Sequence, residues 1–174
     1  MVTANTSLMA GDGETAYANA LKAVQLATQN PEVALGLALS AAIWSRDSDH
    51  AAQIATQMAS AAPTGPYFQA WRIHASAAVS ALEGRTAEAI GGFRDSRARL
   101  IAMQQHFEAA TWVVEAAILL PGEAEVRAWA SEVRPLLEEL RAKPFLDKLD
   151  EVLTSAQTPS AGAKAESRAE SPAG

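Results

Sequence analysis

The sequence contains no cysteine, and this absence excludes several kinds of chemistry together. Without thiols the chain cannot form disulfides, thiolate metal sites, cysteine nucleophiles or redox relays. The cytoplasm is the compartment that agrees most simply with a cysteine-free chain. We therefore expect a cytoplasmic protein.

Long hydrophobic runs are also missing. The longest apolar stretch, 112–120, is interrupted by Glu115 and falls far short of the ~20 residues that cross a bilayer. Residues 1–13 hold no cationic stretch followed by an apolar run, so they do not predict a signal peptide. The sequence predicts no membrane partner.

Positive charge is scarce, since 14 Lys and Arg residues face 20 Asp and Glu residues, giving a formal net charge of −6. This balance argues against a general affinity for nucleic-acid phosphates or anionic membranes. Aromatic residues supply only 6% of the chain, whereas alanine, the best helix former, is abundant. The composition predicts one domain of helices that pack closely through small side chains.

Apolar periodicity and turn signals divide the chain into helices. The dipeptide Asn30-Pro31 combines a helix cap with a proline at the first helical position, and it predicts a helix over 31–45. That segment is apolar almost all round, so it should have neighbours on several sides, and Gly36 is its weak point. Further helices are expected at 14–29, after the polar break at 47–49 to about 62, and at 66–83, 86–105, 106–120, 123–141 and 144–153.

Two of these helices contain residues that favour an irregularity. Gly91 and Gly92 favour a bend in the helix at 86–105. Pro135 removes one backbone hydrogen bond and should kink or break the helix at 123–141. Residues 154–174 carry no bulky hydrophobe and predict a disordered tail, which leaves a flexible stretch at 1–13 and a helical domain at 14–153.

Two polar breaks between helices can be superimposed: 47–52 (DSDHAA) and 84–89 (GRTAEA). The superposition places Ala52 over Ala89 and Ala59 over Ser96, a spacing of 37 residues. Periods of about 34 to 40 residues with two helices per unit are typical of TPR-like arrays. The expected fold is all-α: a right-handed stack of antiparallel helix pairs, a TPR-like α-α superhelix of about seven to eight helices.

The unit around Gly84 resembles the TPR motif most. Gly84 stands at the tight turn, Glu88 and Ala89 begin the second helix, and Phe93 follows four residues later. The sequence departs from the motif where alanine replaces the glycine of the first helix and where the usual Trp and Tyr positions do not align.

A wider resemblance covers about residues 31–153, through EGRTAEAIGGFRDSRARL (83–100), HFEAATWVVEAAILLPGEAEVRAWASEVRPLLEEL (106–140) and RAKPFLDKLDEVL (141–153). These segments resemble the C-terminal helical repeats of large bacterial signalling proteins that carry an adenylate/guanylate cyclase or an AAA-type ATPase domain. Residues 140–146 are similar to the close of that array. The chain has no phosphate-binding GxxxxGK[ST] loop, so the resemblance implies the array alone, without catalytic residues or a cofactor.

The residues that could carry catalysis are scattered. His50, His74 and His106 lack the i, i+4 spacing of zinc hydrolases, and no serine lies in a GxSxG elbow. We therefore expect no enzymatic activity, no cofactor and no metal. An enzyme with an unrecognised helical active site stays a third possibility.

The predicted role is binding of a protein or peptide partner. The four tryptophans fall on four helices, and core packing is the commoner role for such residues. Trp71 is the preferred exception, because it lies on the first helix of its pair and TPR arrays bind through their first helices. Arg94 and Arg97 share one helix face and could clamp an acidic partner, although Asp95 between them also suits an ordinary exposed face. The candidate partner-binding residues are Gln69, Trp71, Arg72, His74, Arg94, Arg97, Trp112 and Glu115.

The binding face is expected on the helices around Trp71 and Trp112. The alternative is a detached C-terminal regulatory array of a cyclase or ATPase signalling protein, with no activity of its own. The sequence identifies neither the partner nor the oligomeric state.

Overall fold

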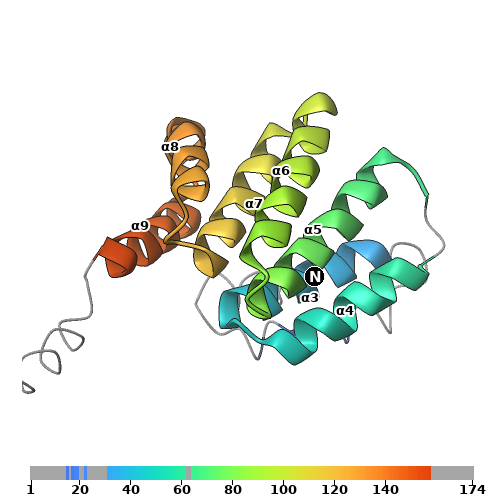
Figure 1. Ribbon diagram of the computed structural model, residues 1–174. Helices are drawn as coiled ribbons and strands as arrows, with labels where there is room; N and C mark the ends of the chain where they lie inside the picture. Colours follow the sequence, from blue (N-terminus) through green and yellow to red (C-terminus); the bar gives the residue numbers. More distant parts are fainter. Residues whose placement is uncertain (1–14, 16, 20–21, 23–30, 62–63, 158–174) are drawn as a thin grey trace, which may run out of the picture.

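The computed structural model describes residues 15, 17–19, 22, 31–61 and 64–157, and its regular structure in these residues is entirely helical. The predicted all-α fold is confirmed. Residues 15, 17–19 and 22, within the expected helix at 14–29, are helical. The rest of that segment, residues 1–13 and most of the expected tail lie outside the described residues. The helices are α3 (Pro31–Ser45), α4 (Ser48–Ser60), α5 (Pro66–Leu82), α6 (Thr86–Ala102), α7 (His106–Leu119), α8 (Ala124–Glu139) and α9 (Lys143–Gln157) (Figure 1).

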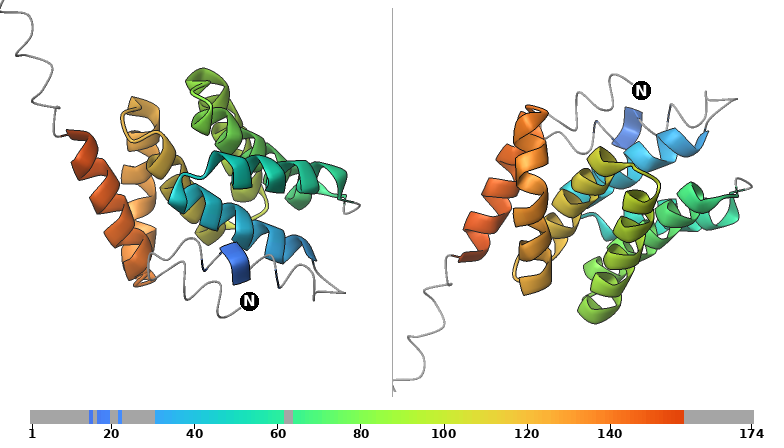
Figure 2. Two further views of the ribbon diagram at one scale, coloured as in Figure 1. Left: turned by 90° about the horizontal axis from the view of Figure 1, so that it is seen from below. Right: turned by 90° about the horizontal axis from the view of Figure 1, so that it is seen from above.

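Helix α7 is the inner helix of the molecule. It packs against α3, α5, α6, α8 and α9, and between Ala109 and Leu120 only Thr111 is not buried. Both views of Figure 2 show α8 and α9 together at one end and α4 and α5 at the other. Because α7 is apolar on all sides, it needs this cover from several neighbours.

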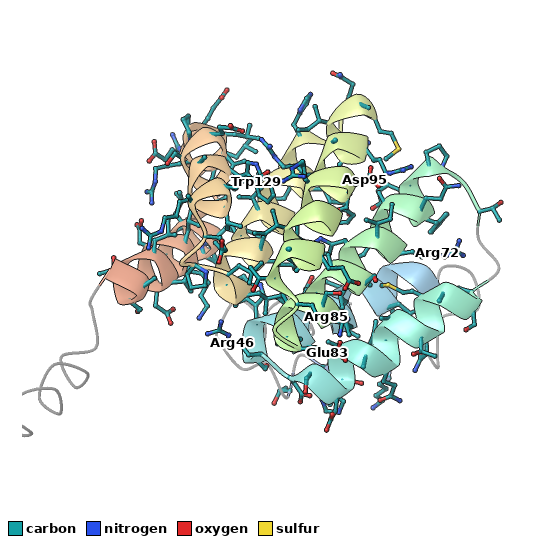
Figure 3. The ribbon with its side chains drawn as sticks, viewed as in Figure 1. Arg46, Arg72, Glu83, Arg85, Asp95 and Trp129 are labelled. Carbon is teal, nitrogen blue, oxygen red and sulfur yellow. The ribbon has the colours of Figure 1, made fainter. Side chains whose placement is uncertain are left out.

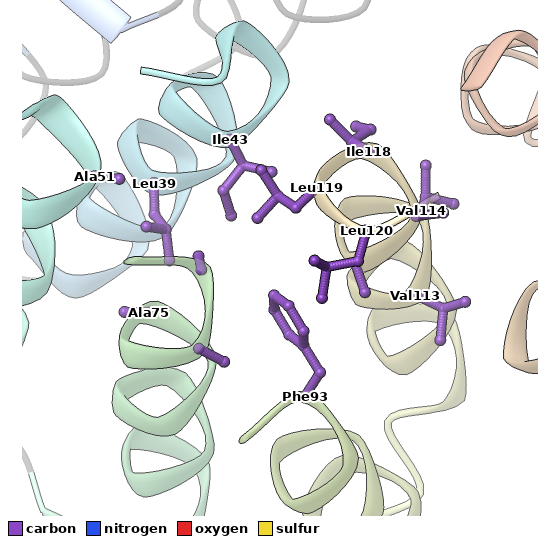
Figure 4. Packing of buried hydrophobic residues seen from close by; sticks show 14 of the residues in the cluster. Leu39, Ile43, Ala51, Ala75, Phe93, Val113, Val114, Ile118, Leu119 and Leu120 are labelled. Carbon is purple, nitrogen blue, oxygen red and sulfur yellow. The ribbon is translucent and has the colours of Figure 1, made fainter. Parts of the chain in front are cut away.

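The core between the two ends is built where α3 meets α7. Leu39 and Ile43 of α3 lie close to Leu119 and Leu120, with Phe93 of α6 on the other side (Figure 4). Small side chains let the remaining helices approach closely, as at Gly92 of α6, where an added β-carbon would be 2.8 Å from that of Ala77 in α5. Helix α6 continues through Gly91 and Gly92, so these glycines serve close packing and do not end the helix.

Four helices end with one residue in the left-handed conformation, at Arg46, Gly84, Gln104 and Arg141. In each case the next residue donates its N–H to a carbonyl five residues earlier, at 2.8–2.9 Å: Asp47 to Ala42, Arg85 to Ser80, Gln105 to Leu100 and Ala142 to Leu137. This is the closure of a Schellman-type helix end. Only one of the four positions is glycine, so three of the turns lack their usual sequence signal.

These turns correct the register of the internal repeat by one residue. Arg46 matches Gly84, so Asp47 matches Arg85, and these two residues are the N-caps of α4 and α6. Ala89 therefore matches Ala51, which is fully buried, and not the half-buried Ala52. Likewise Ser96 matches the buried Met58 and not the exposed Ala59. The polar breaks alone did not mark the left-handed residue that sets the register.

Two helix ends and the expected effect of Pro135 also differ from the prediction. Helix α6 ends at Ala102 and not at 105, because the left-handed Gln104 closes it. Helix α8 runs unbroken through Pro135, which lies on the exposed side. Helix α9 continues beyond Leu153 to Gln157, so the predicted disorder of 154–157 is wrong; there the Ser155 hydroxyl donates to the Glu151 carbonyl at 2.8 Å.

Candidate binding pocket

A pocket of about 200 Å³ opens where α3, α4, α5 and α7 meet. Its walls are mainly apolar and come from segments far apart in the sequence. Helix α3 supplies Leu35, Gly36, Leu37 and Ser40, and the end of α4 supplies Met58 and Ala61. The first two turns of α5 supply Tyr67, Phe68, Trp71 and Arg72, and the first turn of α7 supplies Glu108. Of the candidate residues, Trp71 and Arg72 lie at this pocket.

Trp71 is held in place by α3 and α7. A β-carbon at Gly36 would lie 2.5 Å from Cη2 of the Trp71 ring, so the ring fits only because position 36 has no side chain. On its other side Trp71 meets Trp112 of α7 in an edge-to-face contact, with ring centroids 5.0 Å apart. Gly36 therefore creates the space for this pocket wall and is not merely a weak point of α3.

Glu108 places a carboxylate in the pocket wall. It is half-buried, and the Tyr67 hydroxyl lies 2.8 Å from its Oε1 and 2.9 Å from its Oε2. Burial raises the pKa of Glu108 above its ordinary value, while the Tyr67 hydrogen bond opposes that rise. Burial likewise raises the pKa of Tyr67. The pocket thus combines apolar walls with one carboxylate.

Arg72 is half-buried and joins α5 to the end of α4. Its Nε donates to the Met58 carbonyl at 2.9 Å and its Nη2 to the Ala61 carbonyl at 2.7 Å. The Arg72 side chain is labelled in Figure 3. These carbonyls belong to the last turn and the cap of α4, where cations interact favourably with the helix dipole. Arg72 therefore shapes the pocket by fixing α4 against α5.

His74, Trp112 and Glu115 do not lie on a partner-accessible face, contrary to the prediction. They are 0%, 3% and 4% exposed, because α7 is covered by α5 and its other neighbours. His74 Nε2 lies 2.6 Å from Glu115 Oε2, and the His74 ring stacks on Trp112 with centroids 4.2 Å apart. The pair makes a buried polar link between α5 and α7, directly behind Trp71.

Arg94 and Arg97 do share a face of α6, but both side chains form ion pairs with carboxylates of α8. Arg94 forms a two-point ion pair with Glu125, at 2.7 Å from each oxygen, and Arg97 pairs with Glu132. The predicted clamp for an acidic partner is thus filled from within the chain. Gln69 is exposed and accepts a 3.4 Å hydrogen bond from Arg99.

The sequence prediction missed Tyr67, Phe68 and Glu108, together with the spatial role of Gly36. One signal was available, because Tyr67, Phe68 and Trp71 place three aromatic rings within five residues of an aromatic-poor chain. Glu108 carries no local signal, since only the packing of α7 against α5 brings it to Tyr67.

The described part of the chain lacks two further features. Within it, no three His, Asp or Glu side chains gather in a way that could hold a metal ion. None of its helices combines the length and the apolar character that a bilayer span requires.

No protein-family model, no curated protein and no solved structure matches the chain. The structure itself shows an all-α protein of packed helix hairpins with an open, mainly apolar pocket between four helices.

Proposed function

We propose that this protein is a TPR-like helical-repeat module that binds a segment of a partner protein and holds an apolar side chain of that segment in the pocket of α3, α4, α5 and α7. The observation that carries the proposal is the pocket itself, with Leu37, Phe68 and Trp71 in walls contributed by four helices.

The dimensions and chemistry of the pocket support a side chain as its occupant. At about 200 Å³ it is smaller than the ~300–1,000 Å³ of pockets for drug-sized ligands. Apolar pockets with aromatic walls are where protein interfaces place the anchor residues that carry most of the binding energy. The exposed ring of Tyr67, next to the half-buried Phe68, extends the apolar surface from the pocket to its rim.

The setting that we propose is bacterial signalling or regulation in the cytoplasm. The resemblance of residues 31–153 to the helical arrays of cyclase and ATPase signalling proteins supports a role in signalling or regulation. The absence of cysteine supports the cytoplasm as the compartment. In such proteins the array would act as a surface that binds a regulatory partner. A pocket that holds a side chain of the partner suits that role.

Site-specific photo-crosslinking in the native cell tests the binding role. A photoreactive phenylalanine at Ser40, which lines the pocket, should cross-link a discrete polypeptide, whereas the same probe at the exposed Ser131 of α8 should not. Ala61→Trp, which fills the pocket from its rim, should abolish the cross-link.

The matched control is Ser60→Trp, because Ser60 is exposed, adjacent and outside the pocket lining. It should leave the cross-link intact. The proposal is wrong if Ser40 gives no cross-link, if Ser131 gives the same product, or if Ala61→Trp and Ser60→Trp act alike.

A further inference from the structure

The carboxylate of Glu108 lies in the pocket and has no Arg or Lys partner among the ion pairs of the described residues. None of these ion pairs includes Glu108, whereas most acidic side chains on α6, α8 and α9 have Arg or Lys partners. Burial is the main cause that raises the pKa of Glu108, whereas hydrogen bonds from the Tyr67 hydroxyl and the Trp71 side chain, together with the nearby His74, oppose that rise. A half-buried carboxylate without a counter-charge is a costly arrangement unless a ligand compensates it.

Three aromatic rings line the same pocket as this carboxylate. Tyr67 and Phe68 meet at 80° with centroids 5.7 Å apart, and Tyr67 and Trp71 meet at 74° with centroids 6.5 Å apart. Rings set nearly perpendicular to one another form the walls of a box and not a flat stack. Aromatic walls with a carboxylate are the chemistry that recognises alkylated ammonium ions, through cation–π attraction and charge pairing.

The positive charge of Arg72 lies at the α4 side of the pocket. Its guanidinium donates to the Met58 and Ala61 carbonyls, and it makes no ion pair with Glu108 among those of the described residues. The partial negative charge of the α4 C-terminus therefore offsets Arg72, so Arg72 is not the counter-charge of Glu108.

We propose that the pocket binds an alkylated ammonium group, and that its source is an N-methylated lysine side chain of the partner segment. This inference rests on the proposed function and names the chemistry of its ligand. A bare ammonium brings three donors, whereas the pocket lining is mainly apolar and Glu108 is its single carboxylate. An alkylated ammonium has methyl groups in place of donors and packs them on the rings while its charge faces Glu108.

The experiment compares three small probes on the purified full chain. They are the α-acetylated amide of trimethyllysine, choline, and 3,3-dimethylbutan-1-ol, which has the shape of choline without its charge. Binding is followed by NMR through the indole N–H signal of Trp71, assigned by its loss in Trp71→Phe. The trimethyllysine derivative and choline should each bind at least about tenfold more tightly than the neutral alcohol, a difference of about 1.4 kcal/mol.

Glu108→Gln keeps an acceptor for Tyr67 but removes the charge, and it should bring the affinity for both cations down to that for the alcohol. Glu139→Gln, at an exposed position on α8, is the matched control and should change nothing. If the alcohol binds as tightly as choline, or if Glu108→Gln has no effect, the ammonium site is wrong.

The two proposals can fail separately. A Ser40 cross-link without cation preference would retain the binding module and overturn the ammonium site. Absence of any Ser40 cross-link in the otherwise unchanged protein would overturn the module itself. If choline binds more than tenfold more tightly than the trimethyllysine derivative, the assignment to a partner's lysine is overturned in favour of a free quaternary amine.

Discussion

The Trp71 ring occupies the space that a side chain at Gly36 would need, with Cη2 only 2.5 Å from the position of a β-carbon there. Trp71 cannot withdraw easily, because Trp112, His74 and Tyr67 contact it from other directions. One contact between α3 and α5 thus sets the shape of the pocket.

Gly36→Ala should therefore destabilise the protein although alanine is the better helix former. Forcing a methyl group into a packed site costs about 1–3 kcal/mol, against a gain of about 1 kcal/mol in helix propensity. We expect a net loss of about 1 kcal/mol in the free energy of unfolding and a shifted Trp71 indole signal, measured by urea unfolding and NMR.

The control for this change is Gly91→Ala in α6. An added β-carbon at Gly91 meets nothing within 4 Å, so the substitution should stabilise the protein by about 0.5–1 kcal/mol. Equal effects of the two substitutions would show that the Gly36–Trp71 contact does not constrain the fold.

The buried pair of His74 and Glu115 should show strong coupling. Replacing only one partner, in His74→Phe or Glu115→Leu, leaves the other polar group buried without its hydrogen bond, at a cost of about 3–5 kcal/mol. Removing both should cost clearly less than the sum, because no unpaired group is left. A double-mutant cycle by urea unfolding measures this coupling, and strictly additive losses would contradict it.

Glu108 should make the protein less stable at neutral pH than a neutral residue would. Its raised pKa means that the folded state holds the proton more tightly, so its contribution to stability falls as the pH rises through the ordinary value of 4.5 and then through the folded pKa. Glu108→Gln should raise the Tm at pH 7, and this gain should vanish below about pH 4.

Calorimetry over that pH range checks the prediction. Tyr67→Phe provides the complementary test: it removes a hydrogen bond that lowers the pKa of Glu108, so NMR should show this pKa rising further. A gain in Tm that does not depend on pH would contradict the assignment.

Asp47 should stabilise α4 as its N-cap. Its Oδ1 accepts from the His50 N–H at 3.0 Å, and this hydrogen bond is the main cause that lowers the pKa of Asp47. Asp47→Ala should cost about 1 kcal/mol, and Asp47→Asn much less because the amide oxygen still caps the helix.

The pH dependence of Asp47 has the opposite sign to that of Glu108. A lowered pKa stabilises the folded state above the ordinary value of 3.8, and this contribution is lost as the pH falls through the folded pKa. Urea unfolding at pH 7 and pH 2.5 should thus show a larger cost of Asp47→Ala at pH 7. Equal costs at both pH values would speak against a capping role for the carboxylate.

The sequence by itself determined the all-α fold and the approximate places of the helices. Capping residues, the proline of Asn30-Pro31 and the turn at Gly84 act on their immediate neighbours, so their effect can be predicted locally. The apolar character of the segment that became α3 predicted its burial from several sides, and the structure confirms it through contacts with α4, α5 and α7.

Only the tertiary structure decided which side chains are accessible and which gather in one pocket. The left-handed turns at Arg46, Gln104 and Arg141 lack glycine, so the sequence did not mark them. The unmarked turn at Arg46 is the one that sets the register of the repeat. Trp112 and Glu115 are inaccessible because α7 is buried between its neighbours. The packing of α7 also places Glu108 in contact with Tyr67, 41 residues away in the sequence. Such contacts depend on how whole helices pack, and no local pattern records that packing.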